Sequence, residues 1–183
     1  HIQKARKDRN AKLIVVDPYK TRSAKVADFH YPIKPGTDGA LACSIMHILF
    51  RDNYADKEYM DKYTDDPKGL EKHVKKYTPE WGSKITGLSL REIEEFAKIF
   101  GTTKRLYSRM GYGFTRQRNG ASAMHAAVSL SAVCGKWLYE GGGAFYNNAD
   151  IYKIDKTLIE GLDQIDPNIR ILDQSRIGSI LTG

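Results

Sequence analysis

The stretch Leu13-Ile14-Val15-Val16-Asp17-Pro18 joins four apolar, largely β-branched residues to an aspartate and a proline. A short apolar run without alternation is typical of a strand buried on both faces, as in parallel sheets. Proline cannot continue a central strand, so the strand is predicted to end at Asp17. Ligands of open α/β sheets sit at this carboxyl edge, where a carboxylate can accept hydrogen bonds from ribose hydroxyls. The stretch therefore predicts a nucleotide site in which Asp17 binds the sugar.

A second carboxylate lies in the stretch KPGTDGAL (residues 34–41). Its proline and glycine signal a turn, and Thr37 or Asp38 is predicted to cap the helix that follows, to about Arg51. The two acceptor oxygens of Asp38 match the adjacent N1–H and N2–H₂ donors of guanine. We therefore interpret Asp17 and Asp38 as ligands of the sugar and the base of one guanine nucleotide. The alternative is that Asp38 only caps the helix.

A later segment has the same organisation of strand, loop and helix. Residues 105–110 are predicted to form a buried strand that ends at Gly111-Tyr112-Gly113, and Asn119-Gly120 is predicted to start a helix. A glycine-rich loop between a strand and a helix can bind phosphate through free amide groups, although alone it is more often only a tight turn. Combined with the first edge, it predicts a second side of one site. No G-x-G-x-x-G motif follows the first strand, which disfavours a Rossmann dehydrogenase.

The remaining pattern predicts an α/β fold with helices on both sides of a mainly parallel sheet. Ser89 and Glu92 form a capping box for a helix that Gly101 is predicted to close. Further elements are expected as a helix before residue 12, a short strand at 30–33, and helices at 56–63, 69–77, 155–162 and 173–181. At 183 residues, with 41% hydrophobic and 28% charged residues, the chain fits one domain over residues 1–183.

The charge of the chain is unevenly distributed. The net charge is +7, and residues 1–25 hold eight Lys or Arg against two Asp. The cluster lacks interleaved aromatic residues, so a solvated face that also attracts cofactor phosphates is favoured over a nucleic-acid arm. Nucleic acid is therefore not an expected partner of this segment. A membrane is not expected either, because no apolar run approaches the length of a membrane span.

The two cysteines do not predict a metal site. Cys43 and Cys134 are far apart and belong to no CxxC pair, so they provide no zinc or iron–sulfur framework. Cys43 and His47 share one face of a helix, but the apolar neighbours of Cys43 make a position in or near the core the favoured interpretation. We assign no metal ligand and no catalytic residue.

Seven short segments resemble, in order and spacing, the molybdopterin oxidoreductase family, which is also called the dimethyl sulfoxide reductase superfamily. They are DPYKT (17–21), Ala27-Asp28, KPGTDGAL (34–41), YTPE (77–80), ITG (85–87), GYG (111–113) and GGG (141–143). Each segment is weak alone, whereas the ordered set covers nearly the whole chain. The pattern is most similar to biotin-sulfoxide-reductase-like members.

The resemblance implies a three-layer, Rossmann-like domain that binds a molybdopterin guanine dinucleotide. The residues it assigns to the cofactor are Asp17, Pro18, Thr21, Gly36, Thr37, Asp38, Tyr112 and Arg116. Family members often carry Met at the place of Tyr112 and Gln at that of Arg116, so this chain departs at both. Arg116 could meet a phosphate, or Gln117 could take that role. Asn148 stands near the place where some formate-oxidising members carry an arginine, which disfavours formate as the substrate.

The resemblance also implies that the chain, from His1 to Gly183, is an internal fragment of a longer enzyme. The parent would hold molybdenum or tungsten with two such cofactors (bis-MGD) and perform two-electron oxygen-atom or hydrogen transfer. The metal ligand, and an iron–sulfur cluster where one occurs, would belong to the chain upstream. Expected partners are the other domains of the parent and an electron-transfer subunit, and the fragment alone is expected to be inactive. The alternative is a non-catalytic guanine-nucleotide-binding module.

Overall fold

The computed structural model describes residues 1–146, 154–173 and 176–182. The chain divides into two units, residues 1–147 and residues 148–183, and each is described here by itself. The prediction that residues 1–183 make one domain stays a prediction. In the described residues, no helix is both long enough and apolar enough to cross a membrane.

The first unit alternates strands and helices and is mostly helical. Its elements are α1 (Ile2–Arg9), β1 (Ile14–Val16), α2 (Arg22–Lys25), β2 (Phe29–Tyr31), α3 (Asp38–Arg51), α4 (Lys57–Tyr63), α5 (Pro67–Val74), α6 (Pro79–Thr86), α7 (Leu90–Thr102), β3 (Tyr107–Arg109), α8 (Gly120–Val133) and β4 (Gly143–Phe145). Two 3₁₀ turns, η1 (Tyr112–Arg116) and η2 (Lys136–Leu138), flank α8.

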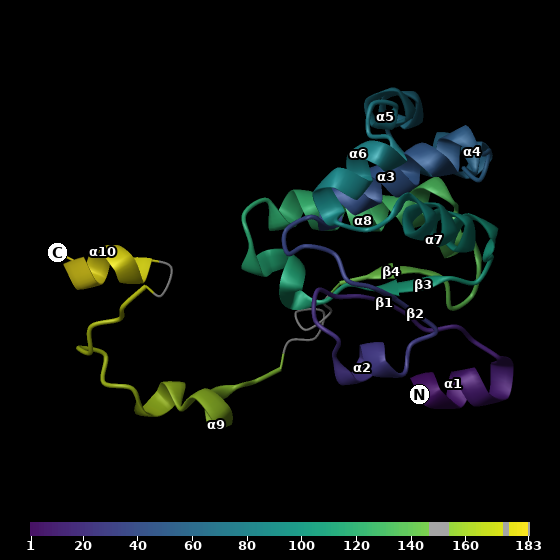
Figure 1. Cartoon of the computed structure of the whole chain (residues 1–183). Helices are drawn as coiled ribbons and strands as arrows, with labels where there is room; N and C mark the ends of the chain where they lie inside the picture. The colour runs from purple at the N-terminus through teal and green to yellow at the C-terminus, as the bar shows by residue number, and fades with distance from the viewer. Residues whose placement is uncertain (147–153, 174–175, 183) are drawn as a thin grey trace. The chain divides into compact units, whose positions relative to one another are not determined.

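The strands form two small parallel sheets in place of the larger sheet that the sequence predicts. β1 pairs with β2, with Val15 opposite His30, and β3 pairs with β4, with Ser108 opposite Ala144. Figure 1 shows α3, α6, α7 and α8 on one side of the strands and α1 and α2 on the other. The fold is thus mixed α/β with short parallel pairs. Each strand has three residues, so the expected strands at 13–17, 30–33 and 105–110 are all longer than those observed.

Helix α3 is at the centre of the core. Its apolar stripe is buried as predicted, with Leu41, Ile45, Ile48 and Leu49 all at most 4% exposed. Helices α6, α7 and α8 pack against α3, and α7 adds Ile93 and Phe100. Burial of this face is the main source of stability, because the free energy gained scales with apolar area removed from water.

The helix from Ser89 begins as predicted and ends later than predicted. The hydroxyl of Ser89 accepts the N–H of Glu92, and the Glu92 carboxylate accepts the N–H of Ser89. Gly101, expected as the C-terminal cap, instead lies inside α7, and the cap is Thr103. A Cβ on Gly101 would run into the ring of Tyr54. The glycine therefore serves close packing, which is a tertiary requirement.

Asp28 fixes part of the basic cluster. Its carboxylate accepts the Leu13 N–H at 2.8 Å and lies 3.2 Å from Arg6 and 3.7 Å from Lys12. The Leu13 hydrogen bond, with the nearby Arg6 and Lys12 charges, lowers the pKa of Asp28 below its usual value. Two of the basic residues thus hold the α1–β1 connection against the loop before β2.

Asp28→Asn is expected to lower the melting temperature at pH 7, while leaving it almost unchanged at pH 2. Because the pKa of Asp28 is lower in the folded chain, its stabilising effect is present above the unfolded pKa and is lost as pH falls through the folded one. Asparagine keeps an acceptor for Leu13 but removes the charge. Thermal unfolding followed by circular dichroism at both pH values measures the effect, and an equal shift at pH 2 would contradict the electrostatic explanation.

The described residues of the second unit include two short helices. They are α9 (Thr157–Glu160) and α10 (Ile177–Thr182), with the 3₁₀ turn η4 (Leu162–Gln164) after α9. Both helices are shorter than the predicted ranges 155–162 and 173–181. Asn148, which was interpreted as disfavouring formate as the substrate, lies outside the described residues.

Candidate functional site

The first side of the candidate site is the carboxyl end of β1. Asp17 directly follows the strand, and its backbone N–H donates to the carbonyl of Tyr31 at 3.3 Å. The imidazole Nε2 of His30 lies 2.8 Å from the carbonyl oxygen of Asp17, and one carboxylate oxygen of Asp17 accepts the Tyr19 N–H. These contacts hold the backbone of Asp17 at the sheet edge. No hydrogen bond to the other carboxylate oxygen is seen from any residue that the structure describes.

Pro18 and Thr21 belong to the turn after β1. Pro18 is exposed, whereas the Thr21 hydroxyl accepts the Ala24 N–H and caps α2. Thr21 therefore has a local structural role that the sequence did not assign. Pro18 follows the strand, which ends at Val16, one residue before the predicted end at Asp17.

The loop before α3 differs in detail from the prediction. Thr37 is the N-cap residue, but its hydroxyl donates to the carbonyl of Lys34 at 2.6 Å and makes no cap hydrogen bond. Asp38 is the first residue of the helix, where its charge favours the helix dipole. Thr37 thus takes the N-cap position that the sequence predicted as one of two choices, but without the side-chain hydrogen bond expected of a cap. The reason is the local turn, in which Thr37 has near-helical backbone angles (φ −108°, ψ 10°).

The second side of the site follows β3. Gly111 precedes η1, and the ring of Tyr112 meets the ring of Tyr146 edge-on, with centroids 5.7 Å apart. Arg116 ends η1 and is exposed, with no hydrogen bond or ion pair to any described residue. Side chains at Gly111 and Gly113 would point into open space. Their lack of side chains leaves the backbone approachable, which suits a ligand phosphate.

Gln117 joins the two sides of the site. Its amide Nε2 donates to a carboxylate oxygen of Asp38 at 3.1 Å, across 79 residues of sequence. A Cβ on Gly36, which has a φ of 82°, would lie 3.1 Å from the amide oxygen of Gln117. The loop before α3 and the loop after β3 therefore lie against each other. The two glycine-containing turns are thus neighbours in the fold, and their role as two sides of one site stays a prediction.

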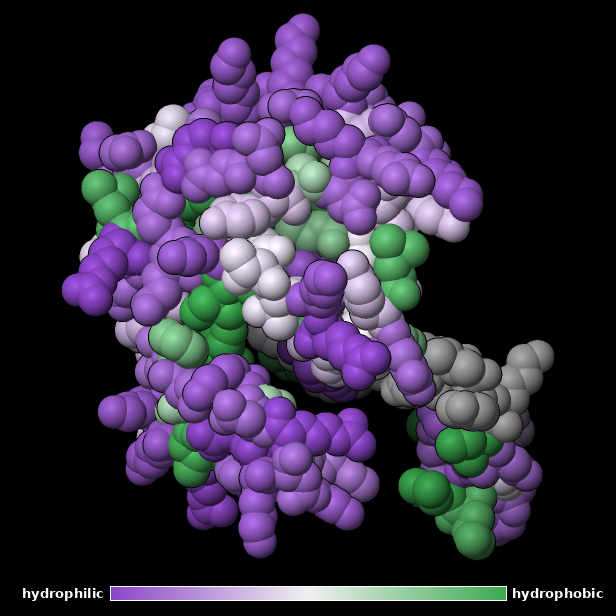
Figure 2. Space-filling model, turned by 90° about the vertical axis from the view of Figure 1, so that its right-hand side faces the viewer, coloured by the Kyte–Doolittle hydropathy of each residue, from purple (hydrophilic) through white to green (hydrophobic). Residues whose placement is uncertain are grey.

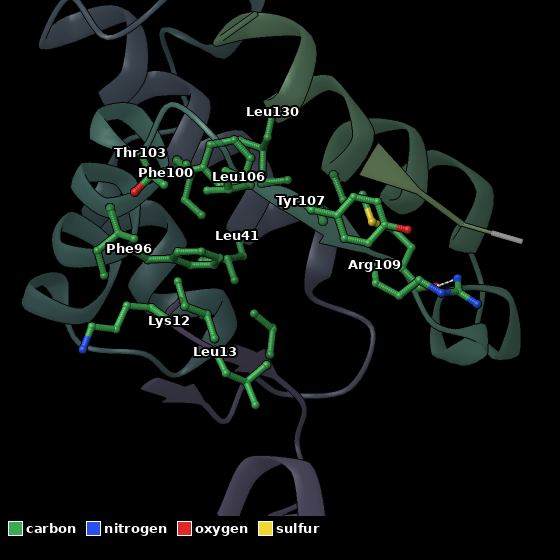
Figure 3. A pocket seen from close by; sticks show the side chains of 18 of the residues that line it. Lys12, Leu13, Leu41, Phe96, Phe100, Thr103, Leu106, Tyr107, Arg109 and Leu130 are labelled. Carbon is green, nitrogen blue, oxygen red and sulfur yellow. Dashed lines mark hydrogen bonds between the residues drawn. The ribbon is translucent and has the colours of Figure 1, made fainter. Parts of the chain in front are cut away.

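A groove runs from this contact between β1 and β3. Its volume is about 530 Å³. Figure 3 shows Lys12 and Leu13 on one wall, with Leu106, Tyr107 and Arg109 on the other, and Leu41, Phe96, Phe100 and Leu130 between them. Asp38 and Gly111 both line the groove near the carboxyl ends of the strands. The groove and the candidate site are thus continuous.

The structure does not support a metal site built from the cysteines. Burial raises the pKa of the Cys134 thiol to about 11 and also raises the pKa of Cys43. His47 lies with Nδ1 3.2 Å from the carbonyl of Val74. In the part of the chain that the structure describes, no group of three or more His, Cys, Asp or Glu residues could hold a metal ion.

Five of the eight residues assigned by resemblance occur in these two loops, whereas Asp17, Pro18 and Thr21 lie at the end of β1 and in the turn after it. The structure joins Gly36 and Asp38 to the second side through Gln117, which the sequence had offered only as a substitute for Arg116. The sequence did not indicate His30 or Tyr146. Only pairing of β1 with β2, and of β3 with β4, brings these two residues to the site.

Gly120→Ala is expected to lower the free energy of unfolding by about 1–3 kcal/mol. A Cβ on Gly120 would overlap the backbone carbonyl oxygen of Phe114, so η1 must move away from α8. This cost exceeds the roughly 1 kcal/mol by which alanine favours a helix over glycine. Gly111→Ala is the matched control, because its Cβ meets open space and its φ of −98° suits alanine. Urea unfolding that gave the same small effect for both variants would contradict the predicted overlap.

Comparisons with known proteins identify the class. A family model described as molybdopterin oxidoreductase matches residues 1–176. The chain therefore belongs to the molybdopterin oxidoreductase family, as its motifs indicated. The family predicted from the motifs is thus confirmed, while the comparisons do not single out its biotin-sulfoxide-reductase-like branch.

Particular relatives include both curated proteins and a solved structure. "Probable oxidoreductase YoaE" of Bacillus subtilis is 38% identical over 180 residues, which are 98% of this chain and 26% of that protein. Dimethyl sulfoxide reductase DmsA of Escherichia coli is 32% identical, covering 79% of this chain and 20% of that protein. Acetylene hydratase from Pelobacter acetylenicus matches with a TM-score of 0.69 and 31% identity, over 73% of this chain and 18% of its own. The chain thus spans about a fifth to a quarter of the curated relatives it matches.

Proposed function

We propose that this chain is part of a longer molybdopterin-dependent oxidoreductase and binds the guanine dinucleotide end of the cofactor. The observation that carries the proposal is the Gln117–Asp38 hydrogen bond, which closes two loops around one carboxylate at the end of the groove. The family membership of residues 1–176 supports it independently. Because the chain covers a fraction of its relatives, the other domains of the parent are its first partners.

The residues fit such a cofactor in chemical kind. Asp17 would accept hydrogen bonds from ribose hydroxyls, and Asp38 would accept the N1–H and N2–H₂ of guanine. The open backbone at Gly111 and Gly113 leaves room for a phosphate group, and the exposed guanidinium of Arg116 would neutralise its charge. Pro18, Thr21, Gly36, Thr37 and Tyr112 would shape the loops around these contacts.

The bound cofactor would supply molybdenum or tungsten and the two-electron chemistry, whereas this chain contributes binding and orientation. The parent would catalyse oxygen-atom or hydrogen transfer and would be most similar to the biotin-sulfoxide-reductase-like members. It would use bis-MGD, a metal ligand upstream of this chain and an electron-transfer subunit. Within the parent, residues 1–183 would form one cofactor-binding domain of the three-layer, Rossmann-like type. The mixed α/β arrangement with parallel strand pairs supports this placement.

Analysis of the purified parent protein tests the proposal. We expect stoichiometric molybdenum or tungsten, and release of guanosine monophosphate after acid hydrolysis of the cofactor. The isolated 183-residue chain, supplied with a chemical electron donor, should show no turnover of sulfoxide, N-oxide, nitrate, polysulfide or formate. A parent that binds guanosine diphosphate but contains neither metal would instead identify the non-catalytic guanine-nucleotide-binding module.

A further inference from the structure

The groove between β1 and β3 is bordered by two strand edges that face each other. In β1, Leu13 and Val15 direct their backbone groups to β2, as the bond from Phe29 N–H to the Leu13 carbonyl and the register show. Successive residues of a strand point their backbone groups to opposite edges. Ile14 and Val16 therefore direct their N–H and C=O groups away from β2, toward the groove.

The facing edge of β3 follows the same pattern. The N–H of Gly143 donates to the carbonyl of Leu106, and the N–H of Met110 donates to the carbonyl of Phe145. With Ser108 opposite Ala144, this places the backbone groups of Ser108 toward β4. Tyr107 and Arg109 therefore direct theirs to the groove. Two rows of backbone donors and acceptors border one apolar channel.

The base of the channel is suited to a buried sheet. Leu41, Ile45 and Phe100 lie along it and are at most 4% exposed. Seen from the side, apolar side chains lie in a hollow between the helices above the strands and the part that contains α1 and α2 (Figure 2). Parallel sheets occur almost only with both faces covered, and a two-stranded sheet is marginal by itself. Two such pairs flanking an apolar channel indicate one sheet that lacks a middle strand.

Chain topology gives the direction of the missing strand. β2 ends shortly before α3, and β3 leads through η1 to Gln117, which contacts the first residue of α3. Both pairs thus present their carboxyl ends toward the start of α3, so a strand parallel to β1 is parallel to β3 as well. It could form ladder hydrogen bonds to Ile14 and Val16 on one side and to Tyr107 and Arg109 on the other.

Topology also indicates the origin of this strand. The connection from β1 to β2 passes through α2, and α1 lies on the same side of the strands as α2 (Figure 1). Crossover connections between parallel strands are right-handed in nearly all cases, so helices on one face carry the chain in one direction across a sheet. A strand that entered α1 would therefore lie beside β1 on the edge away from β2. That edge is the groove.

We propose that the groove receives one β-strand of the parent chain, the strand that precedes α1, parallel to both β1 and β3. The sheet would then have five strands, in the order β2, β1, added strand, β3, β4. Numbered along the chain this order is 3-2-1-4-5, in which the topological switch point lies beside the added strand. Asp17, Asp38 and Gly111 are near the carboxyl ends of its neighbours. The proposed strand therefore completes the wall of the candidate site.

This inference rests on the proposed function only in taking the chain as part of a longer protein. Because this chain spans only 20–26% of the length of the two relatives, a parent of similar length has ample further chain to supply a strand. Pairing of the added strand with β1 and β3 does not depend on a bound nucleotide. An experiment that finds no added strand is therefore distinguishable from one that finds no cofactor binding.

Residue-resolved amide hydrogen exchange in the parent protein and in the 183-residue chain tests the proposal. The groove-directed amides of Val16 and Arg109 are compared with the amides of Val15 and Ser108, which bond to β2 and β4. We expect the ratio of groove-directed to control exchange rates to be at least about 100-fold smaller in the parent than in the chain. Using the ratio removes the effect of a general difference in stability.

Unchanged ratios between the two proteins would overturn the proposal, because the edges would then be free in the parent. Protection that appears in the 183-residue chain as its concentration rises would identify a second copy as the occupant and would also overturn it. Protection of the chain by guanosine diphosphate alone would assign the groove to the nucleotide, with the same consequence for the strand.

Discussion

Leu49→Ala is expected to lower the free energy of unfolding of the chain by about 2–5 kcal/mol. Leu49 lies on α3 at 0% exposure, within the core to which α7 and α8 also contribute. Truncation removes apolar area from the core and leaves a cavity that the surrounding helices close only in part. Total stability of a domain is only about 5–15 kcal/mol, so this single change removes a large share of it.

Leu90→Ala is the matched control for this core substitution. It makes the same chemical change at the first residue of α7, where the side chain is 44% exposed. Its effect should stay within about 0.5 kcal/mol. Urea unfolding with a common slope for the wild type and both variants measures the difference. Similar losses at the two positions would show that α3 is not the centre of the core.

Asp38→Asn is expected to reduce the preference of the parent protein for guanosine diphosphate over adenosine diphosphate by one to two decades. The carboxylate already accepts a side-chain amide N–H from Gln117 at 3.1 Å, so its oxygens are placed to accept the amide and amino donors of guanine. Adenine offers an acceptor at N1 and no amino group at N2. Asparagine would present a donor where an acceptor is needed, which costs roughly 1.5–3 kcal/mol.

Calorimetric titration of both nucleotides against the cofactor-free parent protein measures this preference. Asp17→Asn is the control, since ribose is common to both nucleotides and their affinities should fall together. The competing interpretation gives Asp38 only a structural role at the start of α3, where its charge interacts with the helix dipole for about 0.3–1 kcal/mol. In that case Asp38→Asn would lower stability slightly, and the ratio of the two affinities would be the same in all three proteins.

Local sequence was sufficient for several parts of the fold. The apolar run after Leu13 and the proline at position 18 predicted β1 and, to within one residue, its end, and Ser89 with Glu92 predicted the start of α7. These elements depend on side chains within a few residues of one another, so pattern alone defines them. The family was recognisable for a related reason, because its motifs mark the turns that end those elements.

Tertiary structure decided where these pieces meet. Gly101 was predicted as a cap from its local position, but packing against Tyr54 keeps it inside α7. The contact between Asp38 and Gln117 joins residues 79 apart, and no local pattern specifies which turn reaches which. Local sequence does not specify strand pairing either, since backbone hydrogen bonds between strands are the same for almost every residue type. The sequence by itself therefore determined the elements, the family and the candidate carboxylates, while the folded chain decided their partners and the open edges between β1 and β3.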